Sequence, residues 1–106
     1  MERKLRFSDE AKANLAELES LPSKAAVLKQ VRKALGHLQQ NPAHPGLHTH
    51  EFASLSTPER KIFEAYAQND TPGAYRIFWR YGPDEYDAKK KRTPVITVTS
   101  ITAHPS

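Results

Sequence analysis

The segment Ala74–Tyr81 constrains the fold of this chain more than any other part of it. Its residues, AYRIFWRY, alternate in character, and successive side chains of a β-strand point to opposite faces of a sheet. One predicted face is apolar enough to pack on helices and consists of Tyr75, Ile77 and Trp79. The other places two cations on either side of an aromatic ring and consists of Arg76, Phe78 and Arg80. We therefore expect a central strand with one core face and one open, polar face.

Two amphipathic helices are predicted before this strand. Ser8 is a typical N-cap, and the acidic residues after it suit the first turn of a helix that runs to about Ser20. Pro22 is tolerated in the first turn of a second helix, and Asn41-Pro42 is expected to end that helix. Its apolar stripe, at helical spacing, consists of Ala25, Leu28, Val31, Leu35 and Leu38. Two helices this close in sequence are expected to form an antiparallel hairpin.

Three more strands are predicted. Lys4–Phe7 fits a short first strand, and Lys61–Gln68 and Pro94–Ala103 flank the central strand along the chain. Residues 41–60 are expected to form a long ordered loop, and residues 82–93 a polar connection. Because hairpin-like connections join the last three strands, the sheet should be an antiparallel meander. The predicted class is α+β: a short N-terminal strand and a helical hairpin packed on an antiparallel β-meander, in one domain over residues 1–106.

The composition narrows the classes of protein. At 106 residues, the chain supports one domain with one core. It has no cysteine, which excludes disulfides and thiolate metal sites. No apolar run reaches the roughly 18 residues of a membrane span, and the N-terminal segment lacks the apolar region of a signal peptide. We therefore expect a cytoplasmic protein without a membrane segment. The net charge of +4 is compatible with nucleic-acid binding, although it is also common among ordinary soluble proteins.

Several short motifs, taken in order, are similar to those of one family of proteins. The most specific is the central-strand segment Gly73–Trp79, GAYRIFW. The supporting motifs are Leu38–Pro42 (LQQNP), Pro45-Gly46-Leu47, Ile62–Tyr66 (IFEAY) and Ile101–His104 (ITAH). In this order and spacing, over nearly the whole chain, they resemble the RelE/ParE superfamily of type II toxin–antitoxin toxins, and the resemblance implies a RelE-like fold.

The resemblance implies two possible activities. RelE-like members cut messenger RNA, usually on the ribosome, whereas ParE-like members inhibit DNA gyrase and lack the nuclease residues. Both kinds are held inactive by a partner antitoxin. We predict a toxin that is a metal-independent endoribonuclease, inhibits translation and needs no cofactor. A gyrase-inhibiting toxin or a non-catalytic protein-binding module on the same fold is the alternative.

Three residues are predicted to catalyse RNA cleavage. A metal-independent ribonuclease uses the 2′-hydroxyl as nucleophile and needs a base, an acid and a cation for the phosphate. Arg76, at the family's central-strand arginine, is the candidate phosphate ligand; its alternative is a structural ion pair with Glu64. Glu64 is the candidate base, with a solvated strand carboxylate as its alternative. His104 lies where RelE-like enzymes place basic or histidine residues, and its alternative is an exposed terminal imidazole.

Further residues are predicted to bind RNA. Lys61 and Arg80 could contact phosphates, and Tyr66 could stack on a base. The basic run Lys89, Lys90, Lys91 and Arg92 would attract nucleic acid without sequence preference. For all of these cations, solvated surface charge is the competing interpretation.

Two observations limit these predictions. His44, His48 and His50 suggest a metal site, and His48 and His50 would share one side of an extended strand. No further ligand has a fixed spacing for zinc and cysteine is absent, so no metal is predicted; the alternative is loop histidines that contact phosphate or nothing. Efficient RelE-type members also have a denser basic cluster and often a catalytic tyrosine near the C-terminus, whereas this chain has no tyrosine after Tyr86. Either a smaller catalytic set, such as Glu64, Arg76 and His104, or a reduced or lost nuclease activity would follow.

Overall fold

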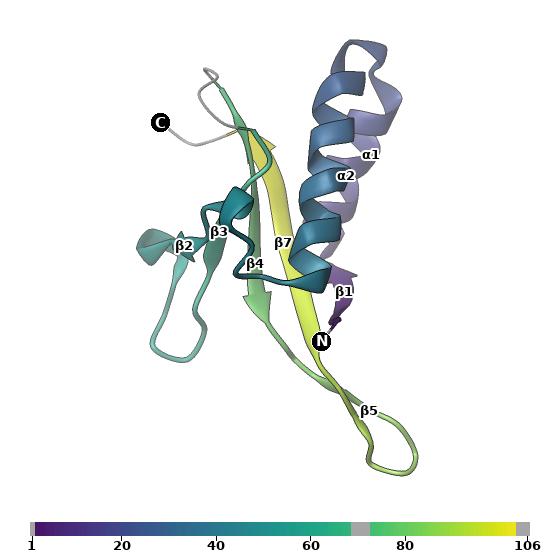
Figure 1. Ribbon diagram of the computed structural model, residues 1–106, viewed down its shortest axis with the longest axis vertical. Helices are drawn as coiled ribbons and strands as arrows, with labels where there is room; N and C mark the ends of the chain where they lie inside the picture. The colour runs from purple at the N-terminus through teal and green to yellow at the C-terminus, as the bar shows by residue number, and fades with distance from the viewer. Residues whose placement is uncertain (1, 69–72, 104–106) are drawn as a thin grey trace.

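The computed structural model describes residues 2–68 and 73–103 of the chain. The main sheet of these residues has five strands in the order β1-β7-β4-β3-β2 (Figure 1). The strands are β1 (Lys4–Phe7), β2 (His50–Glu51), β3 (Phe63–Tyr66), β4 (Tyr75–Tyr81) and β7 (Val95–Ala103). β1 runs parallel to β7, and all other neighbours are antiparallel. The predicted α+β class is confirmed, with β3, β4 and β7 as the antiparallel meander.

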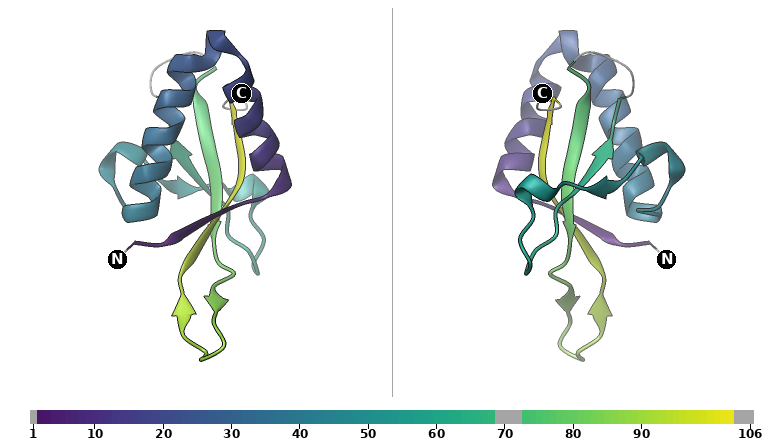
Figure 2. Two further views of the ribbon diagram at one scale, coloured as in Figure 1. Left: turned by 90° about the vertical axis from the view of Figure 1, so that its right-hand side faces the viewer. Right: turned by 90° about the vertical axis from the view of Figure 1, so that its left-hand side faces the viewer.

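The two predicted helices pack side by side on one face of the sheet (Figure 2, left). α1 (Asp9–Ser20) begins at Ser8, whose Oγ accepts the N–H of Ala11 at 3.0 Å and donates to the carbonyl of Thr99 at 2.7 Å. This N-cap therefore also joins α1 to β7. A 3₁₀ turn, η1 (Pro22–Lys24), leads into α2 (Ala25–Gln40). None of the helices in the described residues is long and apolar enough to cross a membrane.

The core lies between this helix pair and the sheet. Trp79 has no exposed surface, and its indole stacks on Phe63 with ring centroids 4.9 Å apart. Other members of the core are Ala11, Leu18, Val31, Leu38, Ile77, Val98 and Ile101. Burial of each large aliphatic or aromatic side chain stabilises the fold by about 1.5–3 kcal/mol. The apolar face of β4 is therefore the core face, as its alternation predicts.

The opposite face of the sheet is not open, and the prediction of an open, polar face is wrong for its centre. Phe78 is only 2% exposed, and the ring of Phe52 covers it with centroids 5.1 Å apart. Phe52 precedes a 3₁₀ turn, η3 (Ala53–Leu55), that lies in front of this face (Figure 2, right). The two aromatic rings exclude water from each other, which alternation within β4 alone does not reveal. Arg76 and Glu64, on the same face, are 7% and 1% exposed.

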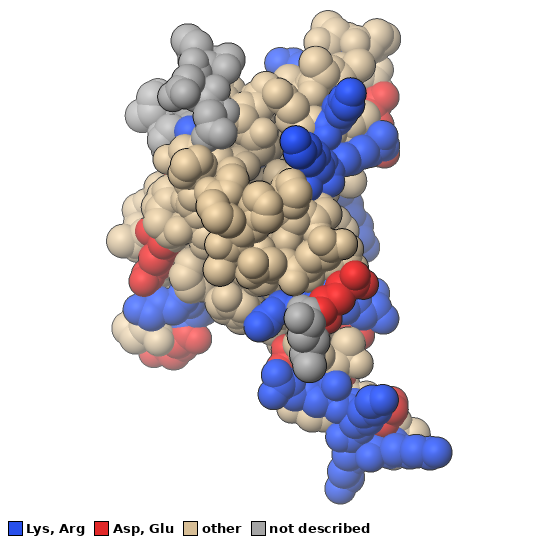
Figure 3. Space-filling view, in the orientation of Figure 1, with Lys and Arg blue, Asp and Glu red and all other residues tan. Residues whose placement is uncertain are grey.

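A small second sheet extends from the far end of β4. β5 (Glu85–Tyr86) and β6 (Arg92–Thr93) form an antiparallel ribbon where a polar connection was expected. The ribbon projects from the body of the protein (Figure 1), and basic side chains gather at this end of the molecule (Figure 3). Arg6 of β1 holds it through two hydrogen bonds to the carboxylate of Glu85, at 2.6 and 2.8 Å. Within the turn, the carboxylate of Asp87 accepts two backbone N–H groups.

Candidate functional site

The strand register brings two of the three predicted catalytic residues together. In β3, Glu64 pairs with Phe78 of β4, and Tyr66 pairs with Arg76. On the other side of β3, His50 of β2 pairs directly with Glu64. Because alternate residues of neighbouring strands share a face, these side chains converge on the face opposite the helices. We call His50, Glu64, Tyr66 and Arg76 the polar cluster.

Arg76 is held in one position by several contacts. Its Nη1 donates to the carbonyl oxygen of Gln68 at 2.6 Å, and its Nε lies 3.9 Å from Oε2 of Glu64. Its guanidinium carbon lies 3.7 Å from the centroid of the Tyr66 ring, which is cation–π geometry. The side chain is 8% exposed. The guanidinium is therefore fixed before any ligand arrives, with Nη2 making no hydrogen bond to a described residue.

Glu64 and His50 share a proton. Nδ1 of His50 lies 3.0 Å from the carbonyl oxygen of His48, and a carbonyl only accepts, so Nδ1 carries a hydrogen. Nε2 lies 2.8 Å from Oε1 of Glu64, so another hydrogen lies between these two atoms. With Glu64 as a carboxylate, both ring nitrogens of His50 carry a hydrogen, and this imidazolium can give one proton.

His50 is the residue of the polar cluster that was missed as a functional candidate. The sequence indicates it only as one of three loop histidines that bind a metal, contact phosphate or contact nothing. Its side chain is 47% exposed, whereas that of Glu64 is 2% exposed. Its partner His48 adopts the left-handed conformation, with φ 47° and ψ 40°, which is uncommon outside glycine. β2 lies within the segment 41–60, which was expected to form a loop, and its pairing with β3 could not be inferred from local sequence.

The remaining predicted site residues are distributed over the molecule. His104 lies outside the described residues, and the described part of β7 ends at Ala103, in register with Tyr75, the neighbour of Arg76. Lys61 is paired with Glu51 at 3.5 Å. Lys89, Lys90, Lys91 and Arg92 belong to the projecting ribbon, and Arg92 is paired with Asp84 at 3.0 Å. Since Arg76 is near the start of β4 and the ribbon follows its end, the structure does not bring the basic run to the polar cluster.

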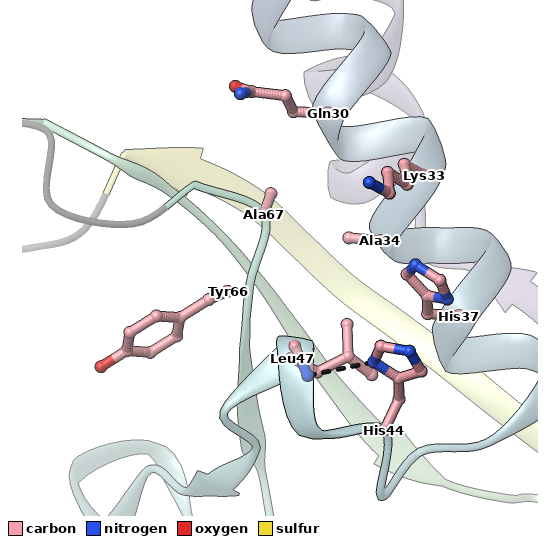
Figure 4. Close-up of a pocket in the computed structure, with 9 residues that line it drawn as sticks. Gln30, Lys33, Ala34, His37, His44, Leu47, Tyr66 and Ala67 are labelled. Atoms are coloured by element: carbon pink, nitrogen blue, oxygen red, sulfur yellow. Dashed lines mark hydrogen bonds between the residues drawn. The ribbon is translucent and has the colours of Figure 1, made fainter.

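A hollow of about 300 Å³ lies next to the polar cluster, between α2 and the 3₁₀ turn η2 (Pro45–Leu47) (Figure 4). The apolar side chains that line it are Ala34, Leu47 and Ala67. The polar side chains on the side of α2 and η2 are Gln30, Lys33, His37 and His44. The imidazoles of His37 and His44 stack with centroids 4.0 Å apart, and Nδ1 of His44 accepts the N–H of Gly46 at 3.0 Å. In Figure 4 the Tyr66 ring points away from α2, toward the side of the polar cluster.

No group of three side chains able to hold a metal ion occurs in residues 2–68 and 73–103. The polar cluster itself offers three kinds of chemical group. These are a fixed guanidinium, an aromatic ring, and an imidazole–carboxyl pair with a transferable proton. The first suits a phosphate and the last suits proton transfer.

The fold defines the class of protein that this chain resembles: an α+β protein with a helix pair on an antiparallel-dominated sheet and an N-terminal edge strand. A solved structure with the same fold is the YoeB dimer from Staphylococcus aureus, with a TM-score of 0.65. The superposition covers 99% of this chain and 100% of that chain, with 14% sequence identity. The predicted RelE-like fold is confirmed by this likeness. No protein-family model and no curated protein sequence matches the chain.

Proposed function

We propose that this protein is the toxin of a type II toxin–antitoxin system and that it cuts messenger RNA at the polar cluster, inhibiting translation in the cytoplasm. One observation carries the proposal most: the guanidinium of Arg76 is fixed by a backbone carbonyl and the Tyr66 ring, beside a proton-bearing His50–Glu64 pair. The likeness of the fold to YoeB supports the class of protein. The remainder of the proposal rests on the chemistry of the cluster.

In the proposed reaction, the 2′-hydroxyl oxygen attacks the neighbouring phosphorus and the bond from phosphorus to the 5′-oxygen breaks. The products are a 2′,3′-cyclic phosphate and a free 5′-hydroxyl. Arg76 donates from Nη2 to a non-bridging phosphate oxygen, where negative charge develops in the transition state. The need for a 2′-hydroxyl makes the reaction specific for RNA.

Proton transfer is assigned to two imidazoles. Nδ1 of His50, the exposed member of the pair, leaves the carbonyl of His48 and gives its hydrogen to the leaving 5′-oxygen, while the hydrogen shared with Glu64 stays on Nε2. Glu64 then acts as a positioning residue, because its carboxylate is enclosed by His50 and Arg76. This role differs from the direct base role that the sequence predicted for Glu64. The proton of the 2′-hydroxyl goes to His104 in this proposal.

Cleavage of a defined messenger by the purified protein tests the proposal. Wild-type protein should cut it, and Arg76→Gln should lower the rate by about 100-fold or more, because one transition-state donor is lost. Since Arg76 is buried, His50→Gln serves as a second variant with less risk to folding, and circular dichroism checks both. We expect a loss of about 100-fold from His50→Gln as well. Lys29→Gln, on the exposed side of α2, is the matched control.

Message that stays intact with folded wild-type protein, alone and in a translating extract, would refute nuclease activity. In that case a supercoiling assay with DNA gyrase distinguishes the ParE-like alternative, and expression without toxicity would indicate a binding module. The proposed partner is an antitoxin with an acidic segment that covers exposed cations. Its binding should become weaker as the salt concentration rises.

A further inference from the structure

A second hollow, of about 380 Å³, lies at the edge of β4 where β3 has ended. The last pair of the β3–β4 ladder is Phe63 with Trp79, so Arg80 and Tyr81 continue beyond β3. The hollow is lined by Glu59, Arg60, Lys61, Phe63, Arg80 and Tyr81. It therefore combines three cations and two aromatic rings with one carboxylate, and it lies apart from the polar cluster.

Two of its cations repel each other, and neither is ion-paired with a carboxylate of the described residues. Arg60 and Arg80 form no ion pair with any carboxylate of the described residues, whereas Lys61 is paired with Glu51. The pKa of Arg80 is lowered, first by burial and then by the positive charge of Arg60. A bound anion would relieve both causes, since it would replace lost hydration and separate the like charges.

Both arginines are attached to fixed backbone. Arg80 pairs with Thr97 of β7 within the sheet. Arg60 closes a tight turn with Thr57: its carbonyl accepts the N–H of Thr57 at 2.8 Å, and its own N–H donates to Oγ1 of Thr57 at 3.1 Å. Little backbone entropy is therefore lost when the two guanidinium groups bind one anion.

Tyr81 lies on the face of β4 that holds Trp79, opposite to Arg80, and it lines the same edge hollow as the two arginines. Tyr81 is 50% exposed, although its ring is supported edge-on by Trp79, at 4.9 Å between centroids, and by Phe63, at 5.6 Å. The guanidinium of Arg3 lies 5.1 Å from the ring. A fixed, accessible aromatic ring next to phosphate-binding cations is the combination that binds single-stranded nucleic acid.

We propose that Arg60 and Arg80 together bind one backbone phosphate of single-stranded RNA, and that the adjacent base packs on Tyr81. The inference rests on the proposed function, because it places this RNA on the same strand that is cut at the polar cluster. Arg76 and Arg80 lie on the same face of β4 and are four residues apart, which corresponds to about 13 Å along a strand. The RNA would run from the cleavage site to this phosphate site over Phe52, which covers Phe78 on the stretch of β4 between the two arginines.

The test measures binding of a labelled single-stranded RNA whose 2′-O-methyl groups prevent cleavage, at several salt concentrations. Each phosphate contact on a single strand contributes about 0.7 to the slope of log affinity against log salt. Arg60→Gln, Arg80→Gln and the double variant should all lower this slope by about 0.7, because both arginines bind the same phosphate. Tyr81→Leu should weaken binding about fivefold or more with no change of slope. Lys29→Gln on α2 is the charge-matched control.

Unchanged affinity and slope in Arg80→Gln would overturn the inference. The inference is also overturned if the slope falls twice as far in the double variant as in each single variant, because the two arginines would then act as independent surface charges. Equal competition by polyglutamate would favour an acidic protein segment over RNA as the ligand.

Failure of this site and failure of the proposed function give different results. Cleavage of an RNA too short to span both sites should be kept in Arg80→Gln and lost in Arg76→Gln. If the Arg60 and Arg80 variants cleave and bind RNA as the wild-type protein does, only the second site is refuted. If RNA binding depends on these arginines but no RNA is cut, only the nuclease proposal is refuted.

Discussion

Replacement of Glu64 by glutamine should lower the free energy of unfolding by about 3 kcal/mol. Glu64 is 1% exposed, with one oxygen 2.8 Å from His50 and the other 3.9 Å from Nε of Arg76. Glutamine has nearly the same volume, so the substitution leaves the packing intact and removes only the negative charge. The guanidinium of Arg76 then stays buried without a carboxylate beside it.

The magnitude follows from the burial of both partners. Breaking a buried ion pair by removing one partner costs about 3–5 kcal/mol. We expect the lower end of this range, because Arg76 keeps its bond to the carbonyl of Gln68 and its contact with Tyr66. His50 is half-exposed, so water can replace part of what it loses. Against a total stability of about 5–15 kcal/mol for a small domain, such a loss is large.

The measurement is denaturant unfolding followed by the fluorescence of Trp79, the one tryptophan of the chain, whose side chain is fully buried. Glu17→Gln on the exposed side of α1 is the control and should change stability by less than about 0.5 kcal/mol. A loss below about 1 kcal/mol in Glu64→Gln would refute the inference that this carboxylate balances Arg76. In the double variant Glu64→Gln/Arg76→Gln, the loss of unfolding free energy should be smaller than the sum of the losses in the two single variants, because no buried charge is left uncompensated.

Two further predictions concern the supports of the site. Ser8→Ala removes the N-cap of α1 and should lower the free energy of unfolding by about 1 kcal/mol, measured in the same denaturation assay; an unchanged midpoint would contradict the cap's role. The bond from Arg6 lowers the pKa of Glu85 below its ordinary value of 4.5, so the attachment of the ribbon is present at neutral pH and is lost as the pH falls through the lowered pKa. In an NMR titration, Arg6→Gln should move the Glu85 midpoint upward, and a midpoint that stays in place would contradict this attachment.

The helices and the three main strands could be predicted because their signals are local. Ser8 supplies a capping hydroxyl, Pro22 marks the restart of the helical chain, and the alternation of Ala74–Tyr81 separates the two faces of a strand. Each of these signals depends only on residues that are close to one another in the sequence. The boundaries moved by one to three residues: β3, for instance, begins at Phe63 rather than Lys61.

The candidate site was predictable only in part. Arg76 and Glu64 were identified from the sequence, and the pairing of β3 with β4 explains why they meet. His50 could not be assigned, because its position depends on a two-residue strand, β2, which is stable only when the edge of β3 is present. Arg60 was missed for a similar reason, since its meeting with Arg80 depends on a turn held by Thr57.

The sequence by itself determined that a helical hairpin would cover one face of an antiparallel sheet, and that Arg76 would lie on the opposite face. Only the tertiary structure decided that Phe52 covers the middle of this opposite face, leaving Arg76 buried among fixed partners at one end of β4 and Arg80 beside a hollow at the other. The physical reason is the range of the interactions. Helical periodicity and strand alternation depend on residues that are neighbours in the sequence, whereas burial and charge pairing depend on which segments, far apart in the sequence, cover one another.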